Sequence, residues 1–520
     1  MQHQDLVLAL DQGTQSVRAM LFDLTGQVVA KAQQHITPYF STHPNWAEQN
    51  GDYLWHHLTL ACQALWTQHP HLRDRVAAAA ITCQRASMIC LDEDMKPLRP
   101  ATIWLDSRRT DNYPRLPWWI KAGVRVAGQS HMLYQLQSKA ECNWLAVDHP
   151  AIWAQTRHFV QVSAYLNLKL TGQLRDAVSS QVGYVPFDYK QQRWADEGDL
   201  KWRALRVKRD QLPPLVQAAE ALGVISAQAS LETGIPQGLT LYAAGSDKAC
   251  EVLACGGISP DVGCISYGTT ATINTGNARY VPPMPFLPAY PAAIPHSYTS
   301  EVIVQRGYWM VNWFKREFAA KEVQQAQERG VAPELLFDEL LDESPPGAMG
   351  LVLQPFWNPG VKFPGPEAKG AVIGFGDVHT RAHLYRAIIE GLAYALRNGK
   401  EQLERRNHAP IQCLRVAGGG SQSDRIMQIT ANVFGLRAER IHTYEASGLG
   451  AAINAAVGAG YFADHALAVA AMSHKGQVFH PQEDHANTYD RIYREVYSRM
   501  YDRLAPLYKS IRHITHYPKY

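Results

Sequence analysis

The sequence predicts an α/β protein built from two related domains that face one another across a cleft. Short apolar runs bounded by turn residues indicate strands, and longer runs with helical periodicity lie between them. A strand, a glycine–threonine turn and a second strand occur at Gly13-Thr14 and recur at Gly268-Thr269, near the start of each half of the 520 residues. Such turns are common, so coincidence is the alternative to duplication. The 46% hydrophobic content is sufficient for a large core.

A three-stranded antiparallel meander is the first element that we expect. Apolar runs at 6–10, 19–22 and 28–30 are separated by clusters of turn residues. A further buried strand is expected at 77–83, where the residues are again almost all apolar.

The second half contains the clearest helices. Leucine and isoleucine recur at four-residue steps within 381–405, and this helix is expected to expose three cations: Arg386, Arg397 and Lys400. A helix over 487–504 has a stripe of tyrosines, which is typical of a packing face. The chain after Pro506 is assigned no structure.

Composition excludes several classes of function. Lysine and arginine exceed aspartate and glutamate by only three residues, which is too few to indicate a nucleic-acid or membrane-surface partner. The eight cysteines form no CxxC pair, so neither a disulfide framework nor a zinc site is expected. Neither an export signal nor an apolar run of 18 residues is visible. We therefore expect a cytoplasmic protein.

Three glycine-rich turns are candidate phosphate sites. In 11–16, backbone N–H groups and the hydroxyls of Thr14 and Ser16 can face an anion, and Arg18 follows on the next strand. The turn at 268–270 offers similar donors, and the turn at 418–423 lies between a strand and a helix N-terminus. A tight turn without a ligand is the alternative in each case. Asp11 would repel a phosphate, so we expect it to hold a hydrated magnesium ion instead.

A carboxylate at a turn is the candidate base. No GxxxxGK[ST] or GxGxxG pattern occurs, which argues against the common nucleotide-binding loops. Transfer of phosphate to an alcohol needs a group that takes the hydroxyl proton. Asp247 follows a short apolar strand in Gly245-Ser-Asp247 and could serve, although it could equally cap the helix that begins there.

Taken in order, these segments resemble the FGGY family of carbohydrate kinases, which includes the glycerol, xylulose, ribulose and fuculose kinases. The match runs from about residue 6 to residue 461. It rests on Asp11–Arg18, Pro44–Gln49, Trp104-x-Asp106-x-Arg108, Gly245–Asp247, Tyr267–Thr269, Phe363–Gly374 with Leu384–Asn398, and Gly418–Ser421 through Gly448–Ala452.

The resemblance implies two actin-like domains of the ribonuclease H fold. It implies a sugar-binding domain at 1–257, an ATP-binding domain at 258–485, and a C-terminal helix and tail at 486–520. It also implies in-line transfer from ATP with magnesium, held by Asp11 and Asp247. The residues that the resemblance assigns to ATP and its phosphates are Gly13, Thr14, Ser16, Arg18, Gly268, Thr269, Gly307, Gly419, Gly420 and Ser421.

Arg85, Trp104 and Asp247 are the residues assigned to the sugar or polyol. Glycerol kinases have a glutamate and an aromatic residue where this chain has Ala86 and Thr272, so a polyol or ketose larger than glycerol is the expected substrate. Lys248 stands where relatives often have glutamine, which leaves the sugar contacts open.

Other functions remain as alternatives at this point. A glycerol kinase proper, an actin-like or chaperone-like ATPase without a sugar substrate, and a catalytically silent sugar sensor would all use the same scaffold. Family members are often homodimers or tetramers, and the sequence does not identify an interface.

Overall fold

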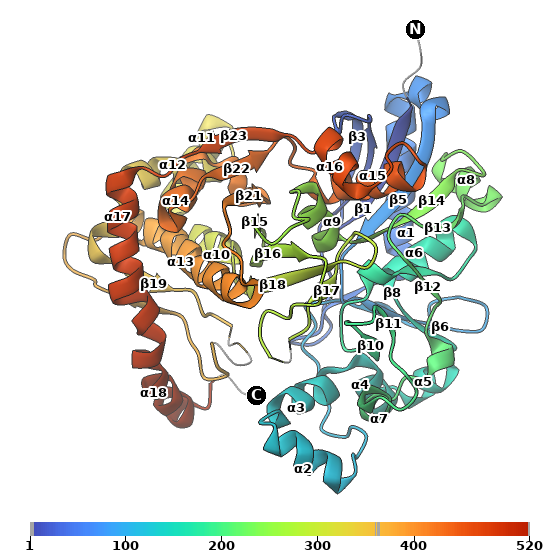
Figure 1. Ribbon diagram of the computed structural model, residues 1–520, viewed down its shortest axis with the longest axis horizontal. Coiled ribbons are helices and arrows are strands. Elements are labelled where there is room, and N and C mark those ends of the chain that lie inside the picture. The colour runs from blue at the N-terminus through green and yellow to red at the C-terminus, as the bar shows by residue number, and fades with distance from the viewer. Residues whose placement is uncertain (1–4, 286, 359, 361–363, 518–520) are drawn as a thin grey trace. The chain divides into compact units, whose positions relative to one another are not determined.

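The computed structural model describes residues 5–517 except 286, 359 and 361–363 (Figure 1). The segment 363–374 therefore begins outside the described residues. The chain divides into two compact units. Unit 1 comprises residues 1–258, 276–299 and 445–474, and unit 2 comprises 259–275, 300–444 and 475–520. The predicted contiguous ranges 1–257, 258–485 and 486–520 differ from these units, because two later segments of the chain return to unit 1.

The elements up to residue 258 comprise both strands and helices. The strands are β1 (Leu6–Gln12), β2 (Ser16–Phe22), β3 (Val28–His35), β4 (Glu48–Gln49), β5 (Val76–Cys83), β6 (Met88–Leu91), β7 (Ala101–Thr102), β8 (His158–Gln161), β9 (Asp176–Ala177), β10 (Phe187–Asp188), β11 (Arg193–Trp194), β12 (Leu215–Val216), β13 (Ala221–Val224) and β14 (Thr240–Ser246). The helices are α1 (Gly51–Gln68), α2 (Trp118–Val126), α3 (Ser130–Lys139), α4 (Glu141–Asp148), α5 (Pro150–Gln155), α6 (Val162–Thr171), α7 (Leu200–Ala204), α8 (Ala227–Thr233) and α9 (Asp247–Ala254).

The elements after residue 258 are likewise a mixture of strands and helices. The strands are β15 (Val262–Tyr267), β16 (Ala271–Asn277), β17 (Tyr290–Pro291), β18 (Tyr298–Val304), β19 (Val352–Gln354), β20 (Ala371–Ile373), β21 (Cys413–Ala417), β22 (Ala438–Ile441) and β23 (Lys475–Phe479). The helices are α10 (Trp309–Phe318), α11 (Ala320–Arg329), α12 (Pro333–Asp342), α13 (Arg381–Asn407), α14 (Asp424–Phe434), α15 (Ala446–Gly458), α16 (His465–Met472), α17 (Glu483–Ile492) and α18 (Ser498–Thr515).

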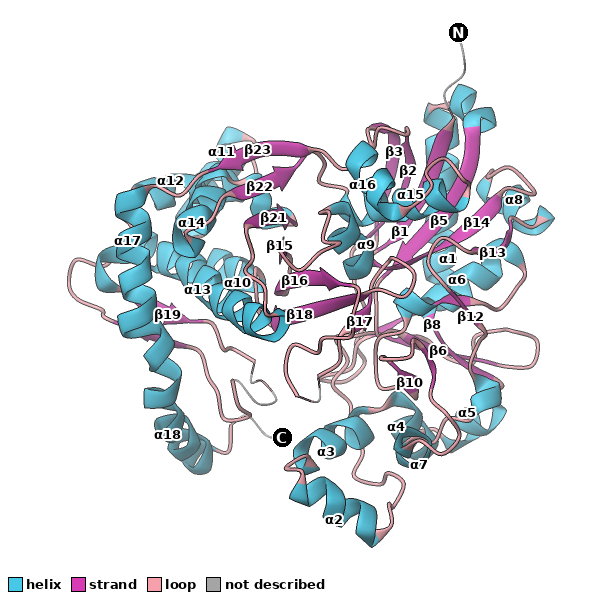
Figure 2. Cartoon of the chain, in the orientation of Figure 1, coloured by secondary structure: helices cyan, strands magenta, loops and turns pink. Residues whose placement is uncertain are grey.

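Unit 1 contains a six-stranded sheet in the order β13-β14-β5-β1-β2-β3. Strands β1, β2 and β3 pair antiparallel, which confirms the predicted meander, and β5 and β14 add in parallel. All seven residues of β1 are buried because helices cover both faces of the sheet (Figure 2). Leu6, Leu8 and Leu10 belong to the same core cluster as residues of α1, while Gly448 of α15 approaches Met20 on the opposite face of β2.

The sheet of unit 2 repeats this order. Its strands run β18-β16-β15-β21-β22-β23, with β15 and β16 antiparallel and β21 and β22 added in parallel. An antiparallel edge strand follows in each case, namely β13 beside β14 and β23 beside β22. The repeated order supports the duplication suggested by the two glycine–threonine turns, and it confirms the prediction of two related α/β domains.

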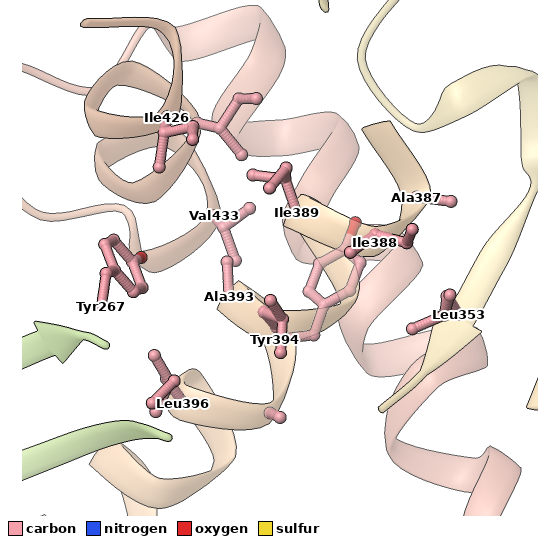
Figure 3. Close-up of a cluster of buried hydrophobic side chains, with 14 of the residues drawn as sticks. Tyr267, Leu353, Ala387, Ile388, Ile389, Ala393, Tyr394, Leu396, Ile426 and Val433 are labelled. Carbon is pink, nitrogen blue, oxygen red and sulfur yellow. The ribbon is translucent and has the colours of Figure 1, made fainter. Parts of the chain in front are cut away.

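Helix α13 is the largest contributor to the core of unit 2. Its apolar stripe packs with residues of α14 and β19 (Figure 3). Gly391 allows the close approach to β19, since a Cβ at that position would lie 2.4 Å from the carbonyl oxygen of Leu353.

The prediction that α13 exposes three cations is wrong. Arg386 and Arg397 are each only 8% exposed, and Lys400 is half-buried in an ion pair with Glu404. Arg386 contacts Glu390 on the same helix, and Arg397 pairs with Asp490. Burial of these cations is tolerated because each has a carboxylate partner.

The C-terminal helix extends farther than expected. The tyrosine stripe is a packing face, as predicted, and it includes a π-helical turn at Tyr493–Tyr497. The helix then continues through Pro506 to Thr515, beyond the predicted end. Tyr508 anchors this extension, because its side chain is buried and its hydroxyl donates to Gln354 Oε1 at 3.0 Å.

Candidate functional site

The candidate acceptor site is at the carboxyl edge of the unit 1 sheet. Strands β1, β5 and β14 run parallel, with Gln12 in register with Cys83 and Cys83 in register with Ser246. The residues that follow these strands therefore emerge along one edge, where α/β proteins usually bind ligands. The predicted residues gathered on this edge are Asp11, Gly13, Thr14, Arg85 and Asp247.

Asp247 is the first residue of α9, and Ser246 caps this helix. The carboxylate accepts a 2.7 Å hydrogen bond from the backbone N–H of Lys248, and the side chain is only partly exposed. Burial raises the pKa of Asp247 above its usual value, while the charges of Lys248 and Arg85 oppose this shift. Lys248 is held by an ion pair with Glu251 at 2.9 Å. Asp247 is thus a carboxylate of increased basicity at a sheet edge.

Asp11 is a second carboxylate on the same edge. It is 4% exposed, and its Oδ2 is 2.9 Å from Arg18 Nη1. The pKa of Asp11 is raised to about 6. Burial is the main cause and the carboxylates of Asp247 and Glu445 add to it, whereas the charge of Arg18 lowers this pKa. The two aspartates are therefore close enough to repel one another, and a divalent cation would relieve that repulsion.

Sequence reasoning missed Glu445 as a member of this cluster. Its carboxylate lies 3.3 Å from Arg18 Nε and 2.7 Å from Lys31 Nζ. Glu445 immediately precedes α15 and is more than 400 residues from Arg18, so no local pattern connects the two. The one sequence feature that could have indicated Glu445 is its position just before the glycine motif at 448–452.

The predicted sugar residues are also on this edge. The indole of Trp104, which is 36% exposed, donates from Nε1 to Thr14 Oγ1 at 3.1 Å. The guanidinium of Arg85 lies 5.3 Å from the ring centre of Tyr290. Tyr290 was not among the predicted residues, because it follows Arg85 by some 200 positions in a proline-rich segment.

Two further segments of the family pattern form one buried charge cluster. Asp106 accepts from the backbone N–H of Ala47 at 2.8 Å, and Glu48 pairs with Arg99 and with Arg108, the latter at 2.7 Å. The guanidinium of Arg108 lies over the rings of Trp46 and Trp144, at 4.3 and 4.2 Å. The cluster fixes residues 44–49 to residues 104–108.

The predicted nucleotide turns of unit 2 lie next to one another. Strands β15 and β21 are parallel, and Ser266 is in register with Ala417, so the turns at 268–270 and 418–421 follow the same edge. A Cβ at Gly420 would lie 2.3 Å from the ring of Tyr308, and one at Gly307 would lie 2.2 Å from the backbone nitrogen of Ala271. Tyr308 in turn donates its backbone N–H to the carbonyl of Gly268 at 3.0 Å.

Gly419 and Ser421 differ in what they offer to a ligand. A Cβ at Gly419 would meet nothing within 4 Å, so this residue faces open space. Ser421 is 1% exposed, and both its backbone N–H and its hydroxyl donate to the carbonyl of Gly418. Its donors are therefore used within the turn. Thr269 shapes the other turn by accepting from Trp309 at 3.2 Å through its carbonyl.

Neither a membrane-spanning helix nor a cluster of three metal-ligating side chains occurs among the described residues. Over residues 5–517, apart from the gaps at 286, 359 and 361–363, no helix combines the length and hydropathy needed to cross a membrane. Within the same part of the chain, no group of three or more histidine, cysteine or acidic side chains could hold a metal ion. A magnesium ion at Asp11 and Asp247 would therefore need other ligands, such as phosphate oxygens and water.

Comparisons with known proteins identify the family of the chain. Residues 6–254 match the N-terminal domain, and residues 263–459 the C-terminal domain, of the FGGY family of carbohydrate kinases. An uncharacterized sugar kinase of Escherichia coli, YgcE, is 28% identical over 98% of this chain and 96% of its own length. A xylulose kinase of Lactococcus lactis is 26% identical over 96% and 97% of the two chains.

The fold agrees as well. A crystal structure of xylulose kinase from Rhodospirillum rubrum superposes with a TM-score of 0.80 at 26% identity, covering 97% of this chain and all of that one. The two family matches together span most of the sequence. The chain therefore belongs to the FGGY family of carbohydrate kinases, and the protein is an ATP-dependent sugar kinase.

Proposed function

We propose that the protein transfers the γ-phosphate of ATP in line to one hydroxyl of a ketose or polyol larger than glycerol, with Asp247 as the general base. The observation that carries this proposal is the environment of Asp247, a carboxylate of raised pKa at the sheet edge that also carries Asp11, Arg85 and Trp104.

Asp247 would take the proton of the attacking hydroxyl. A base works best when its pKa lies near the working pH while most of it stays ionised. Burial raises the pKa of Asp247, and the cations Arg85 and Lys248 limit that rise. The same cations favour the ionised form that the reaction requires.

The phosphates would be bound mainly by backbone groups. In unit 1 we assign the transferring phosphate to the backbone of Thr14 and to Ser16 and Arg18. We assign Gly13 a role in shaping the turn, because its N–H donates to the carbonyl of Ser16 at 3.1 Å. In unit 2 we assign the nucleotide to Gly268, Thr269, Gly307, Gly419 and Gly420. We assign Ser421 a supporting role, because its donors are used within its own turn.

Magnesium would be held by Asp11 and Asp247 together with phosphate oxygens. The repulsion between the two carboxylates is consistent with a cation, and few protein ligands are usual for magnesium in kinases. When bound, the ion neutralises the charge that develops on the phosphate during transfer.

The acceptor would lie between Arg85 and Trp104. Trp104 offers a partly exposed ring on which a sugar can pack, and Arg85 offers hydrogen-bond donors. Ala86, which is small and partly exposed, leaves more room than the glutamate of glycerol kinases would. The xylulose kinases among the relatives favour a ketopentose over glycerol as the first acceptor to test.

The test is an assay of ADP release with magnesium and a panel of acceptors: glycerol, pentitols, hexitols, ketopentoses and sugar acids. The proposal predicts a large stimulation by at least one acceptor larger than glycerol and a much weaker one by glycerol. Comparable kcat/KM on glycerol would indicate a glycerol kinase proper. ATP hydrolysis that no acceptor stimulates would instead indicate an ATPase without a sugar substrate.

A further inference from the structure

A closed ring of hydrogen bonds surrounds Thr14 at the acceptor edge. Thr14 Oγ1 donates to Gln84 Oε1 at 2.8 Å, and Gln84 Nε2 donates to Gln49 Oε1 at 2.6 Å. Gln49 Nε2 then donates back to the carbonyl of Thr14 at 3.2 Å and to that of Pro38 at 2.6 Å. Gln49 and Gln84 are 2% and 3% exposed, so water has little access to their amides.

Elementary chemistry fixes the direction of every bond in this ring. The carbonyls of Pro38 and Thr14 only accept, so the amide nitrogen of Gln49 must face them and its oxygen must face Gln84. The amide nitrogen of Gln84 therefore faces Gln49, and its oxygen faces Thr14. An oxygen acceptor at that position requires the hydroxyl of Thr14 to be the donor.

Trp104 occupies a further site on the same hydroxyl. The indole N–H can only donate, so Thr14 Oγ1 accepts from Trp104 Nε1 at 3.1 Å. The hydroxyl has one hydrogen, which is used, and two lone pairs, of which one is used. What remains is a single acceptor position on a partly exposed side chain.

This remaining position does not suit a phosphate. Phosphate oxygens accept hydrogen bonds, and Thr14 Oγ1 has no hydrogen left to donate to them. A hydroxyl of a sugar or polyol can donate to it, and Trp104, the proposed sugar-packing ring, is already in contact with the same oxygen.

We propose that Thr14 Oγ1 accepts a hydrogen bond from a hydroxyl of the acceptor substrate, and that Gln49 and Gln84 are positioning residues that hold its hydrogen away from that hydroxyl. In this turn, backbone N–H groups rather than the Thr14 hydroxyl would then contact the phosphate. The inference rests on the proposed function, since it names a contact of that same acceptor site. It also gives a purpose to Gln49, which lies in the family segment 44–49.

The surrounding charge cluster keeps the ring in place. Glu48, next to Gln49, pairs with Arg108, and Arg108 lies between two tryptophan rings. Gln49 therefore follows a residue that is held by a buried ion pair, which suits a positioning residue.

The first test compares Thr14→Val, which keeps the shape of the side chain, with Thr14→Ser, which keeps the hydroxyl. We expect Thr14→Val to raise the KM of the best acceptor by about 3- to 10-fold, the effect of one lost hydrogen bond, and Thr14→Ser to restore most of it. The dissociation constant for ADP with magnesium should change less than about twofold.

Deoxy analogues of that acceptor give a readout that a purely structural role would not change. Wild type should discriminate against one particular deoxy analogue, and Thr14→Val should lose that discrimination alone. Gln49→Met should reproduce the loss in weaker form, because the amide of Gln84 is then free to reverse. Gln63→Met, on the exposed side of α1, is the matched control and should behave as wild type.

Two results would overturn the inference. A rise in the ADP dissociation constant or the ATP KM of Thr14→Val, with the acceptor KM unchanged, would assign the hydroxyl to phosphate. Equal changes in both, with the deoxy discrimination intact, would make its role structural. Failure of the proposed function would give a different result. The wild-type protein would then bind ADP but phosphorylate no acceptor.

Discussion

The two sheet edges share a scaffold and differ in chemistry. In both units an antiparallel pair of strands encloses a glycine–threonine turn, and parallel strands follow in the same order. The unit 1 edge carries the charged groups Asp11, Arg18 and Asp247. The unit 2 edge presents glycines, backbone groups and the paired rings of Tyr267 and Tyr308, whose centres are 4.7 Å apart.

Under the proposed function, this difference divides the reaction between the two units. Charged side chains can move a proton and attract cations, whereas glycine turns present backbone N–H groups to phosphates without changing charge. The proposal therefore assigns the placing of both sites to the shared strand order, and the chemistry of each site to the residues that follow its strands.

The largest expected effect comes from removing the charge of Asp247 at the unit 1 edge. Asp247→Asn removes the proposed base but keeps the size of the side chain, so we expect kcat to fall by about 10²–10⁴-fold. The affinity for ADP without magnesium and the thermal stability should stay unchanged. Steady-state kinetics and calorimetry measure these quantities. Asp210→Asn, an exposed carboxylate in the same unit, is the control and should keep full activity. Near-normal turnover in Asp247→Asn would contradict the assignment.

A smaller effect is expected from the unit 2 edge. Gly419→Ala adds a methyl group in open space, so folding should be unaffected while a nucleotide approaching the turn meets an obstacle. We expect the KM for ATP to rise about tenfold, with the melting temperature and the acceptor KM unchanged. Gly198→Ala, also in open space but in unit 1, should alter none of the three. If Gly419→Ala leaves the ATP KM unchanged, the nucleotide does not contact this turn.

The smallest expected effect is a shift in pH dependence. Lys248 lowers the pKa of Asp247, so Lys248→Met should raise that pKa and protonate the base at a higher pH. Activity should then fall earlier as the pH decreases, by up to about fivefold at the acid end and little at pH 8. The profile of kcat against pH measures this. Lys201→Met, which removes a half-buried lysine paired with Asp199, is the control and should leave the profile unchanged. A shift of the Lys248→Met profile toward lower pH would show that Lys248 does not lower the pKa of the base.

Much of the scaffold could be predicted from local sequence. The meander, the buried strand β5 and the tyrosine packing face all follow from patterns within a few residues. The burial of Arg397 could not, because its partner Asp490 is 93 positions away. The same holds at the site: Asp11, Thr14 and Asp247 stand in turns with a recognisable composition, whereas the pairing of Gln49 with Gln84 and of Arg18 with Glu445 depends on tertiary packing.

Hydrogen exchange of backbone amides, measured with ADP alone and with the acceptor alone, tests directly whether the two substrates bind to different units. We expect ADP to slow exchange mainly in 267–270, 306–309 and 417–421 of unit 2. We expect the acceptor to slow exchange mainly in 84–87, 103–105 and 246–249 of unit 1. Protection of the unit 1 segments by ADP, with exchange in the unit 2 turns unchanged, would show that the nucleotide is assigned to the wrong unit.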